Sequence, residues 1–133
     1  MIQLTKSAST TIALTLTEKC TLTNPNYLFE FECNDTGVKE YCIAADTATT
    51  AERIRFNKFT ITEDSTPNNL NGEVDLPING WYSYTVYEQA SSTNLDPANA
   101  TGIVEKGKMY LSTTPITVAE YTSTSTTTPT YNG

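Results

Sequence analysis

One stretch decides the fold that this sequence predicts. It reads Leu76-Pro77-Ile78-Asn79-Gly80-Trp81-Tyr82-Ser83-Tyr84-Thr85-Val86-Tyr87. The first residues have the pattern of a strand end, the glycine marks a tight corner, and the aromatic and β-branched residues that follow are typical of a strand. Successive side chains of a strand point to opposite faces, so one face carries Tyr82, Tyr84 and Val86. The opposite face carries Trp81 and Tyr87.

The spacing L-x-x-x-G-x-Y-x-Y-x-V resembles the E–F corner of immunoglobulin-like sandwiches. In that corner a tyrosine near the start of strand F hydrogen-bonds back across the turn. Tyr82 occupies this position, so we expect its face to be the core. The 26 threonines and 8 tyrosines of the chain favour strands, and each carries a polar hydroxyl group. We therefore expect an all-β, antiparallel two-sheet immunoglobulin-like sandwich of about 7–9 strands.

Short strands separated by turn residues are expected along the whole chain. Alternating apolar residues at 27–33, followed by a turn at 34–37, predict a hairpin with 38–44. Lys106-Gly107 predicts a second hairpin, made of 102–105 and 108–112. Other strands are expected at 11–17, 53–62 (with a bulge near 57–58), 72–76, 81–89 and 116–121.

A single sandwich domain is expected over residues 1–121. Residues 1–6 are interpreted as a short strand or an N-terminal arm. Residues 122–133 are rich in Thr and Ser and are expected to form a C-terminal arm that a partner orders.

The charge of the chain bears on its partners. It carries 8 basic and 15 acidic side chains, for a formal net charge of −7. Phosphate binding needs clustered Lys and Arg, so we expect neither nucleic acid nor an anionic membrane as a partner. No apolar run approaches the roughly 18 residues of a membrane-spanning helix, and no basic and apolar leader follows Met1. Folding in a cytoplasm is expected.

Residues suited to nucleophilic catalysis are few. The chain has no histidine, which removes the commonest general base and most zinc sites. The three cysteines, Cys20, Cys33 and Cys42, form no C-x-x-C pair and are odd in number, so we expect reduced, half-buried thiols.

Carboxylates offer two further possibilities. Glu30 and Glu32 share a strand face, an arrangement more typical of a solvated surface than of glycoside hydrolysis. Neither Glu63-Asp64 nor the loop at 94–96 has the dense acidic spacing of a calcium loop. We therefore expect no catalytic residue, no cofactor and no metal, and hence no enzyme.

Apolar and aromatic side chains outside the expected core are candidates for partner binding. The candidates are Trp81, Tyr87, Ile2, Leu4, Tyr121 and Tyr131. The first two lie on the face opposite Tyr82, and the others lie in or beside the terminal segments. Two interpretations of Trp81 and Tyr87 remain open: they meet a partner, or the long loops and terminal arms of the chain cover them.

Three segments together resemble one protein family. They are 81–89 (Trp-Tyr-Ser-Tyr-Thr-Val-Tyr-Glu-Gln), 93–96 (Thr-Asn-Leu-Asp) and 102–109 (Gly-Ile-Val-Glu-Lys-Gly-Lys-Met). The chain is similar here to small immunoglobulin-like β-sandwich structural proteins of tailed bacteriophages, those of crAss-like phages above all. The likeness covers roughly residues 71–112, and it brings no active-site residues.

The resemblance implies a virion component made in the cytoplasm of a host bacterium and located on the capsid surface. Its function would be that of an auxiliary, decoration or head-fibre protein that stabilises the shell through sheet edges and terminal arms. The major capsid protein or other virion proteins would be its partners, and a homo-oligomer is possible. The alternative is a tail- or fibre-associated adhesive module that binds host surface glycans through Trp81 and Tyr87.

Overall fold

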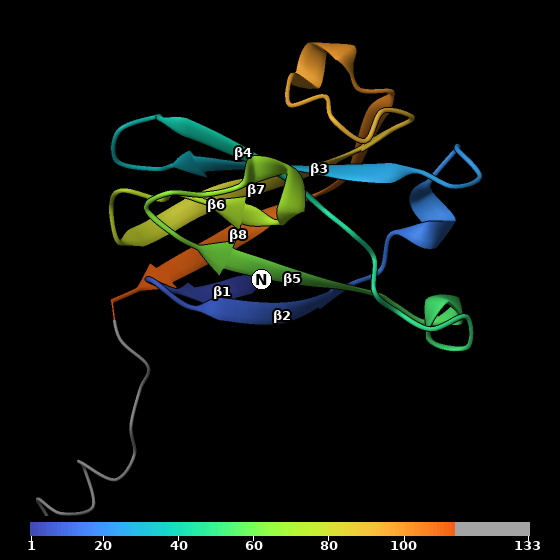
Figure 1. Cartoon of the computed structure of the whole chain (residues 1–133), viewed down its shortest axis with the longest axis horizontal. Helices are drawn as coiled ribbons and strands as arrows, with labels where there is room; N and C mark the ends of the chain where they lie inside the picture. The colour runs from blue at the N-terminus through green and yellow to red at the C-terminus, as the bar shows by residue number, and fades with distance from the viewer. Residues whose placement is uncertain (114–133) are drawn as a thin grey trace, which may run out of the picture.

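The computed structural model describes residues 1–113 of the chain, and for Ile54 the backbone only. The described part is a sandwich of a five-stranded sheet, in the order β1-β8-β7-β3-β4, and a three-stranded sheet, in the order β2-β5-β6 (Figure 1). The strands are β1 (Ile2–Thr5), β2 (Ser9–Leu14), β3 (Asn26–Cys33), β4 (Lys39–Ala44), β5 (Asn57–Glu63), β6 (Glu73–Val74), β7 (Gly80–Gln89) and β8 (Gly102–Ser112). The expected all-β two-sheet sandwich is confirmed. Its strand pairs are antiparallel as expected, except β1–β8 and β5–β6, which are parallel.

The connections contain four short 3-10 helices. These are η1 (Thr17–Lys19), η2 (Glu52–Ile54), η3 (Asn69–Asn71) and η4 (Pro97–Asn99). The expected strand at 116–121, the expected arm at 122–133, and the candidates Tyr121 and Tyr131 lie outside the described residues.

The corner before β7 forms as the sequence predicts. Gly80 takes a φ of +125°, which L side chains rarely adopt, and so turns the chain into the strand. The Tyr82 hydroxyl donates to the Ile78 carbonyl at 2.5 Å and accepts from the Ile78 amide at 3.3 Å. Tyr82, Tyr84 and Val86 are all buried in the core, as expected.

Aromatic packing joins the two sheets in the core. Phe59 of β5 lies edge-on to two rings of β3, with ring centroids 5.1 Å from Phe29 and 5.2 Å from Tyr27. Edge-to-face contacts of this kind add to the free energy of simple burial. The β3–β4 hairpin pairs as predicted, with Phe29 opposite Cys42.

The structure corrects two of the expected strand details. β8 runs without a break from Gly102 to Ser112, so Lys106-Gly107 is not a turn. The irregularity expected near 57–58 is absent, since β5 begins at Asn57 and Phe56 precedes it. A register shift lies instead in the β7–β8 pair, between Val86 and Tyr87.

The N-terminal segment belongs to the sheet and is not an arm. β1 pairs in parallel with β8, and Ile2 lies opposite Met109. The side chains of Ile2 and Leu4 are 1% and 2% exposed, and both belong to the core. This placement corrects the expectation that they are surface residues available to a partner.

A buried carboxylate ties this N-terminal region to the corner. Glu63 accepts hydrogen bonds from the Ser7 amide at 2.8 Å and the Leu76 amide at 3.0 Å, and it pairs with the Lys6 ammonium at 3.0 Å. Burial by itself would raise the pKa of Glu63, but these three partners outweigh burial and lower it. The β1–β2 turn, the end of β5 and the start of the corner are thereby held together.

Candidate functional site

The outer face of the five-stranded sheet is the first candidate surface. The register sets its side chains in rows across β8, β7 and β3. From one end to the other, the rows are Tyr110 and Trp81; Lys108, Ser83 and Glu32; Lys106, Thr85 and Glu30; and Ile103, Tyr87 and Leu28. The face thus has an aromatic end, a charged middle and a second apolar end.

The aromatic end holds an exposed pair. Trp81 and Tyr110 lie directly opposite each other on β7 and β8, with ring centroids 5.1 Å apart and planes at 67°. They are 46% and 36% exposed. Large aromatic side chains that stay this accessible are enriched at contact surfaces.

Tyr87 lies on the same face but does not join this pair. Six residues of extended strand separate it from Trp81, a distance of about 20 Å. Its hydroxyl donates to Glu30 at 2.9 Å, and Glu30 also pairs with Lys39 at 3.7 Å. Trp81 and Tyr87 therefore both lie on the outer face as expected, but they do not form one platform.

The far end of the outer face is partly covered by the chain itself, although Ile103 at this end is 52% exposed. Leu28 and Ile43 point to this side and are buried, yet they do not belong to the main core. The segment between β7 and β8, which contains η4, stands over this end of the sheet (Figure 1). Burial raises the pKa of Tyr41 on β4, and the carboxylates of Glu30 and Asp96 raise it further. A loop thus covers part of one end of the face, and Trp81 and Tyr110 stay exposed at the other.

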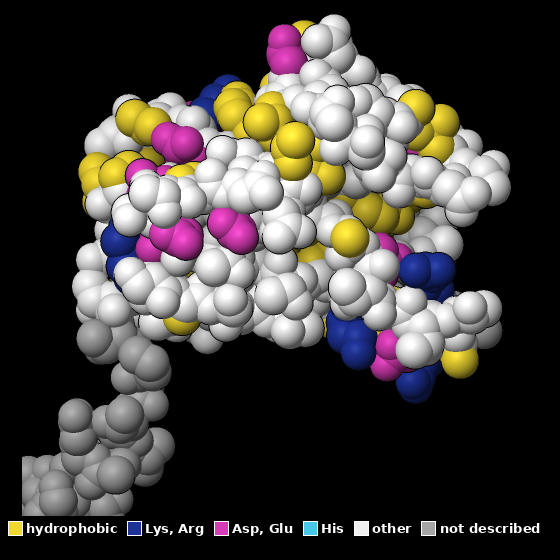
Figure 2. Space-filling view, viewed as in Figure 1, with side chains coloured by type: hydrophobic (Ala, Val, Ile, Leu, Met, Phe, Trp, Pro, Cys, Tyr) yellow, Lys and Arg dark blue, Asp and Glu magenta, His cyan; other side chains and the backbone are white. Residues whose placement is uncertain are grey.

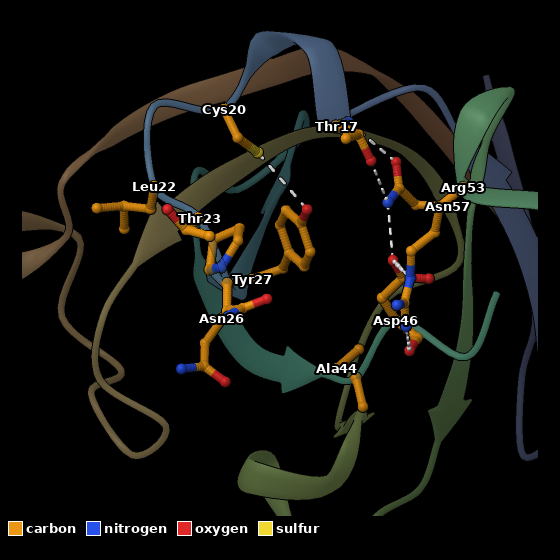
Figure 3. Close-up of a pocket in the computed structure, with 13 residues that line it drawn as sticks. Thr17, Cys20, Leu22, Thr23, Asn26, Tyr27, Ala44, Asp46, Arg53 and Asn57 are labelled. Atoms are coloured by element: carbon orange, nitrogen blue, oxygen red, sulfur yellow. Dashed lines mark hydrogen bonds and ion pairs between the residues drawn. The ribbon is translucent and has the colours of Figure 1, made fainter. Parts of the chain in front are cut away.

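A hollow at the end of the sandwich opposite the Trp81–Tyr110 pair is the second candidate site (Figure 3). It measures about 260 Å³ and lies between the segment containing η1 and the segment containing η2. Polar residues make up most of its lining: Thr17, Cys20, Thr23, Asn24, Asn26, Tyr27, Asp46, Arg53 and Asn57. Figure 2 shows it as an indentation at the right of the molecule, with Lys and Arg side chains below it.

Asn57 and Asp46 organise the wall of this hollow. The side-chain oxygen of the buried Asn57, Oδ1, accepts hydrogen bonds from the backbone amides of Leu16 and Thr17, at 2.9 and 3.1 Å. Its amide nitrogen donates to Thr17 Oγ1 at 2.9 Å and to Asp46 Oδ2 at 2.7 Å. One side chain therefore bridges the two segments that enclose the hollow.

Asp46 also holds Arg53 in place. The Arg53 Nε donates to Asp46 Oδ2 at 3.0 Å, and Nη2 donates to the Asp46 carbonyl at 3.3 Å. Burial by itself would raise the pKa of Asp46, but hydrogen bonds from Asn57, Ala48 and Lys58 together with the charge of Arg53 lower it. The hollow therefore contains one fixed negative charge and one fixed positive charge side by side.

The other chemical candidates remain dispersed. Cys20, Cys33 and Cys42 are free thiols. In residues 1–113 no three His, Cys, Asp or Glu side chains gather where they could hold a metal ion. No helix within that range has the length and apolar character to cross a membrane. Glu30 and Glu32 share the outer face of the sheet, as the alternation predicts.

Comparison with known proteins identifies no family for this chain. No protein-family model matches the chain, and no curated protein matches it. One solved structure, described as a "putative glycoside hydrolase" from Bacteroides vulgatus ATCC 8482, aligns with 86% of this chain at 12% identity and a TM-score of 0.43. The chain covers 17% of that protein's length. A likeness at this level supports no conclusion about activity.

The sequence alone did not indicate Tyr110, Asp46 or Arg53 as site residues. Tyr110 lies at 108–112, which the sequence predicts to be half of a hairpin, and its pairing with Trp81 depends on the β7–β8 register. Asp46 and Arg53 fall in the segment at 45–52 and at its border, where a loop and a helical turn fit the sequence equally well. A weak signal is present, since Asp and Arg seven residues apart flank a run of Thr and Ala that ends in Glu.

Proposed function

We propose that this chain is a non-catalytic structural module of a phage particle that docks on the capsid exterior as an auxiliary or head-fibre component. The observation that carries the proposal is the Trp81–Tyr110 pair, two exposed aromatic rings in contact at one end of the outer sheet face. Aromatic anchors surrounded by polar groups are the usual energetic centre of protein–protein interfaces.

Other exposed apolar side chains lie at the same end of the molecule. Ile78 belongs to the corner that precedes Trp81, and Val38 follows the β3–β4 turn, where the Asn34 amide donates to the Trp81 carbonyl at 3.1 Å. Ile78 is 37% exposed and Val38 46% exposed. Apolar side chains are visible at this left-hand end in Figure 2. A docking end with Trp81 and Tyr110 at its centre is consistent with this distribution.

Charge and sequence resemblance support the same proposal. The net charge of −7 suits the outside of a shell better than contact with packaged nucleic acid. The resemblance to virion proteins of crAss-like phages lies in residues 71–112, and these residues include both aromatic anchors.

The alternative of an adhesive module that uses Trp81 and Tyr87 as one sugar platform receives less support. The two side chains lie about 20 Å apart along the strand, and Tyr87 is engaged with Glu30. Shell docking remains the proposal because it needs only the Trp81–Tyr110 end.

Co-sedimentation with purified empty capsids of a crAss-like phage, quantified by mass spectrometry, tests the proposal. Saturable binding at many copies per particle is expected. The double variant Trp81→Ala/Tyr110→Ala should weaken binding more than tenfold, because loss of central anchors costs about 2 kcal/mol or more. Ile103→Ala, which removes an exposed apolar side chain at the far end of the same face, is the matched control and should bind normally. Absence of binding by the wild-type chain would overturn the proposal.

A further inference from the structure

We propose that the hollow between the η1 and η2 segments binds a neutral, hydroxylated ligand of about one sugar ring, recognised by Tyr27, Arg53 and Thr17. The hollow lies at the end of the sandwich opposite the Trp81–Tyr110 pair. The inference is independent of shell docking, since it concerns other residues and another surface.

The first observation is a buried hydroxyl without an oxygen or nitrogen partner. Tyr27 is 5% exposed, and its ring is fixed edge-on against Phe59. Among residues 1–113 the polar contact of its hydroxyl is the Cys20 thiol, at 3.5 Å. Sulfur is a weak hydrogen-bond partner, and buried tyrosine hydroxyls usually find a strong one. Figure 3 shows this hydroxyl within the lining of the hollow.

The second observation is a guanidinium group fixed at the rim. Two contacts with Asp46 orient the Arg53 side chain, and these use two of the five N–H donors that a guanidinium carries. The contacts of the described residues leave its Nη1 group available to a ligand. A planar donor that is already oriented loses little conformational freedom on binding.

Charge decides the class of ligand. A small anion would be attracted by Arg53 but repelled by the Asp46 carboxylate. A cation would be attracted by Asp46 but repelled by Arg53. Asp46 already accepts hydrogen bonds from Arg53, Asn57, Ala48 and Lys58, so it offers no free acceptor to a cationic donor. Hydroxyl groups carry no charge and both donate and accept, which suits the hydroxyls of Tyr27 and Thr17.

Size limits the ligand to about one ring. A volume of about 260 Å³ far exceeds the roughly 30 Å³ that one water occupies, and it is just below the range of about 300–1,000 Å³ for drug-sized ligands. A second hollow of about 220 Å³ shares Thr17, Arg53 and Asn57 with the first, and Phe56 lines it. An attached sugar would extend in that direction.

The position of the hollow keeps it accessible while the other end is docked. Tyr27 lies near the start of β3, whereas Cys33 at the end of β3 pairs with Tyr82 beside the aromatic end. Six residues of strand place the two sites about 20 Å apart.

The test is a titration of the full chain with neutral sugars, in which ¹⁵N-edited NMR spectra are recorded at each sugar concentration. The panel is glucose, galactose, mannose, fucose and N-acetylglucosamine, with glucuronate as the charged comparison and glycerol as the acyclic one. We expect saturable binding of at least one neutral sugar in the millimolar range, with shifted amides in 17–27 and 44–57. Tyr27→Phe removes one oxygen atom and should weaken binding at least tenfold, and Arg53→Gln should do so as well.

Tyr110→Phe removes a phenol oxygen far from the hollow and should leave the affinity unchanged. Thermal unfolding of each variant separates loss of binding from loss of folding. The inference is overturned if no neutral sugar saturates, if glucuronate alone binds, if glycerol binds as tightly as the sugars, or if folded Tyr27→Phe binds like the wild type. The capsid co-sedimentation can fail while the sugar titration succeeds, and the sugar titration can fail while the co-sedimentation succeeds.

Discussion

The ring of Tyr84 occupies the space that a side chain at position 107 would need. A β-carbon built on Gly107 would lie 2.6 Å from Tyr84 Cε1 and 2.7 Å from its hydroxyl oxygen. The ring lies across the adjacent strand, and its hydroxyl donates to Glu105 at 3.2 Å. A glycine within a strand often marks such a close approach, and here it leaves room for the ring of a core tyrosine from the adjacent strand.

Gly107→Ala should destabilise the protein. The methyl group would displace the Tyr84 ring, and overpacking of this kind costs about 1–3 kcal/mol. Urea unfolding followed by tyrosine and tryptophan fluorescence measures the change. Gly102→Ala, in the same strand with no atom within 4 Å of the added carbon, is the matched control and should shift the midpoint little. Equal midpoints for the two variants would contradict the packing described.

Tyr82→Phe should lower the free energy of unfolding by about 1–2 kcal/mol. The substitution removes the hydroxyl that bonds both the carbonyl and the amide of Ile78, and a part-buried carbonyl is left without its donor. Chemical denaturation of wild type and variant gives the difference. Tyr110→Phe removes an exposed hydroxyl and should change stability by less than about 0.5 kcal/mol; a cost as large as that of Tyr82→Phe would show that the corner bonds are not the cause.

Acid should weaken the fold through Glu63. Its pKa is lowered in the folded protein, while an unfolded glutamate titrates near about 4.3. The unfolded chain therefore takes up the proton first as the pH falls. The stabilisation is fully present above about pH 5 and is lost as the pH falls through the folded pKa. Glu63→Gln should be less stable at pH 7 and should show a shallower loss of stability below pH 5.

The measurement is a series of urea unfolding curves between pH 7 and pH 3. Glu18→Gln, which changes an exposed carboxylate in η1, should follow the wild-type pH profile. A Glu63→Gln profile parallel to that of the wild type throughout would exclude Glu63 as a source of the acid dependence.

Cys42 should react with thiol reagents only through unfolding. Its side chain is fully buried, and burial raises the pKa of its thiol to about 12, so the reactive thiolate is scarce at neutral pH. Iodoacetamide labelling at pH 8, resolved by peptide mass spectrometry, should mark Cys42 at the global unfolding rate. In urea all three cysteines should react rapidly. Fast labelling of Cys42 in the native protein would mean that this region opens locally.

The corner and the β3–β4 hairpin could be predicted from sequence because both are local. The Tyr82 bond to Ile78 spans four residues, and the hairpin turn follows directly on the alternating residues of β3. In each case the residues that determine the geometry stand close together in the chain.

The errors arose where distant contacts decide the structure. Lys106-Gly107 has the composition of a turn, but Tyr84 from the neighbouring strand explains the glycine. Ile2 and Leu4 belong to a segment that the sequence predicts to be a short strand or an arm, and both are candidates for partner binding. Their burial depends on β8, at the other end of the described chain.

In the candidate sites, too, the features set by local sequence could be predicted and those set by distant contacts could not. Alternation along β7 was enough to place Trp81 on the outer face, but its partner Tyr110 required the register of β8. The hollow depends on Asn57 reaching Thr17 and Asp46, which are 40 and 11 positions away in the sequence. Contacts of this range leave no periodic trace in a single sequence.

The parallel pairing of β1 with β8 has a consequence for synthesis. During translation the Ile2–Thr5 segment has no strand to pair with until residues 109–112 leave the ribosome. This pairing joins nearly opposite ends of the described chain. Long-range pairing of this kind makes folding slow. A ribosome stalled before residue 109 should therefore hold a nascent chain that a protease still cuts near its beginning.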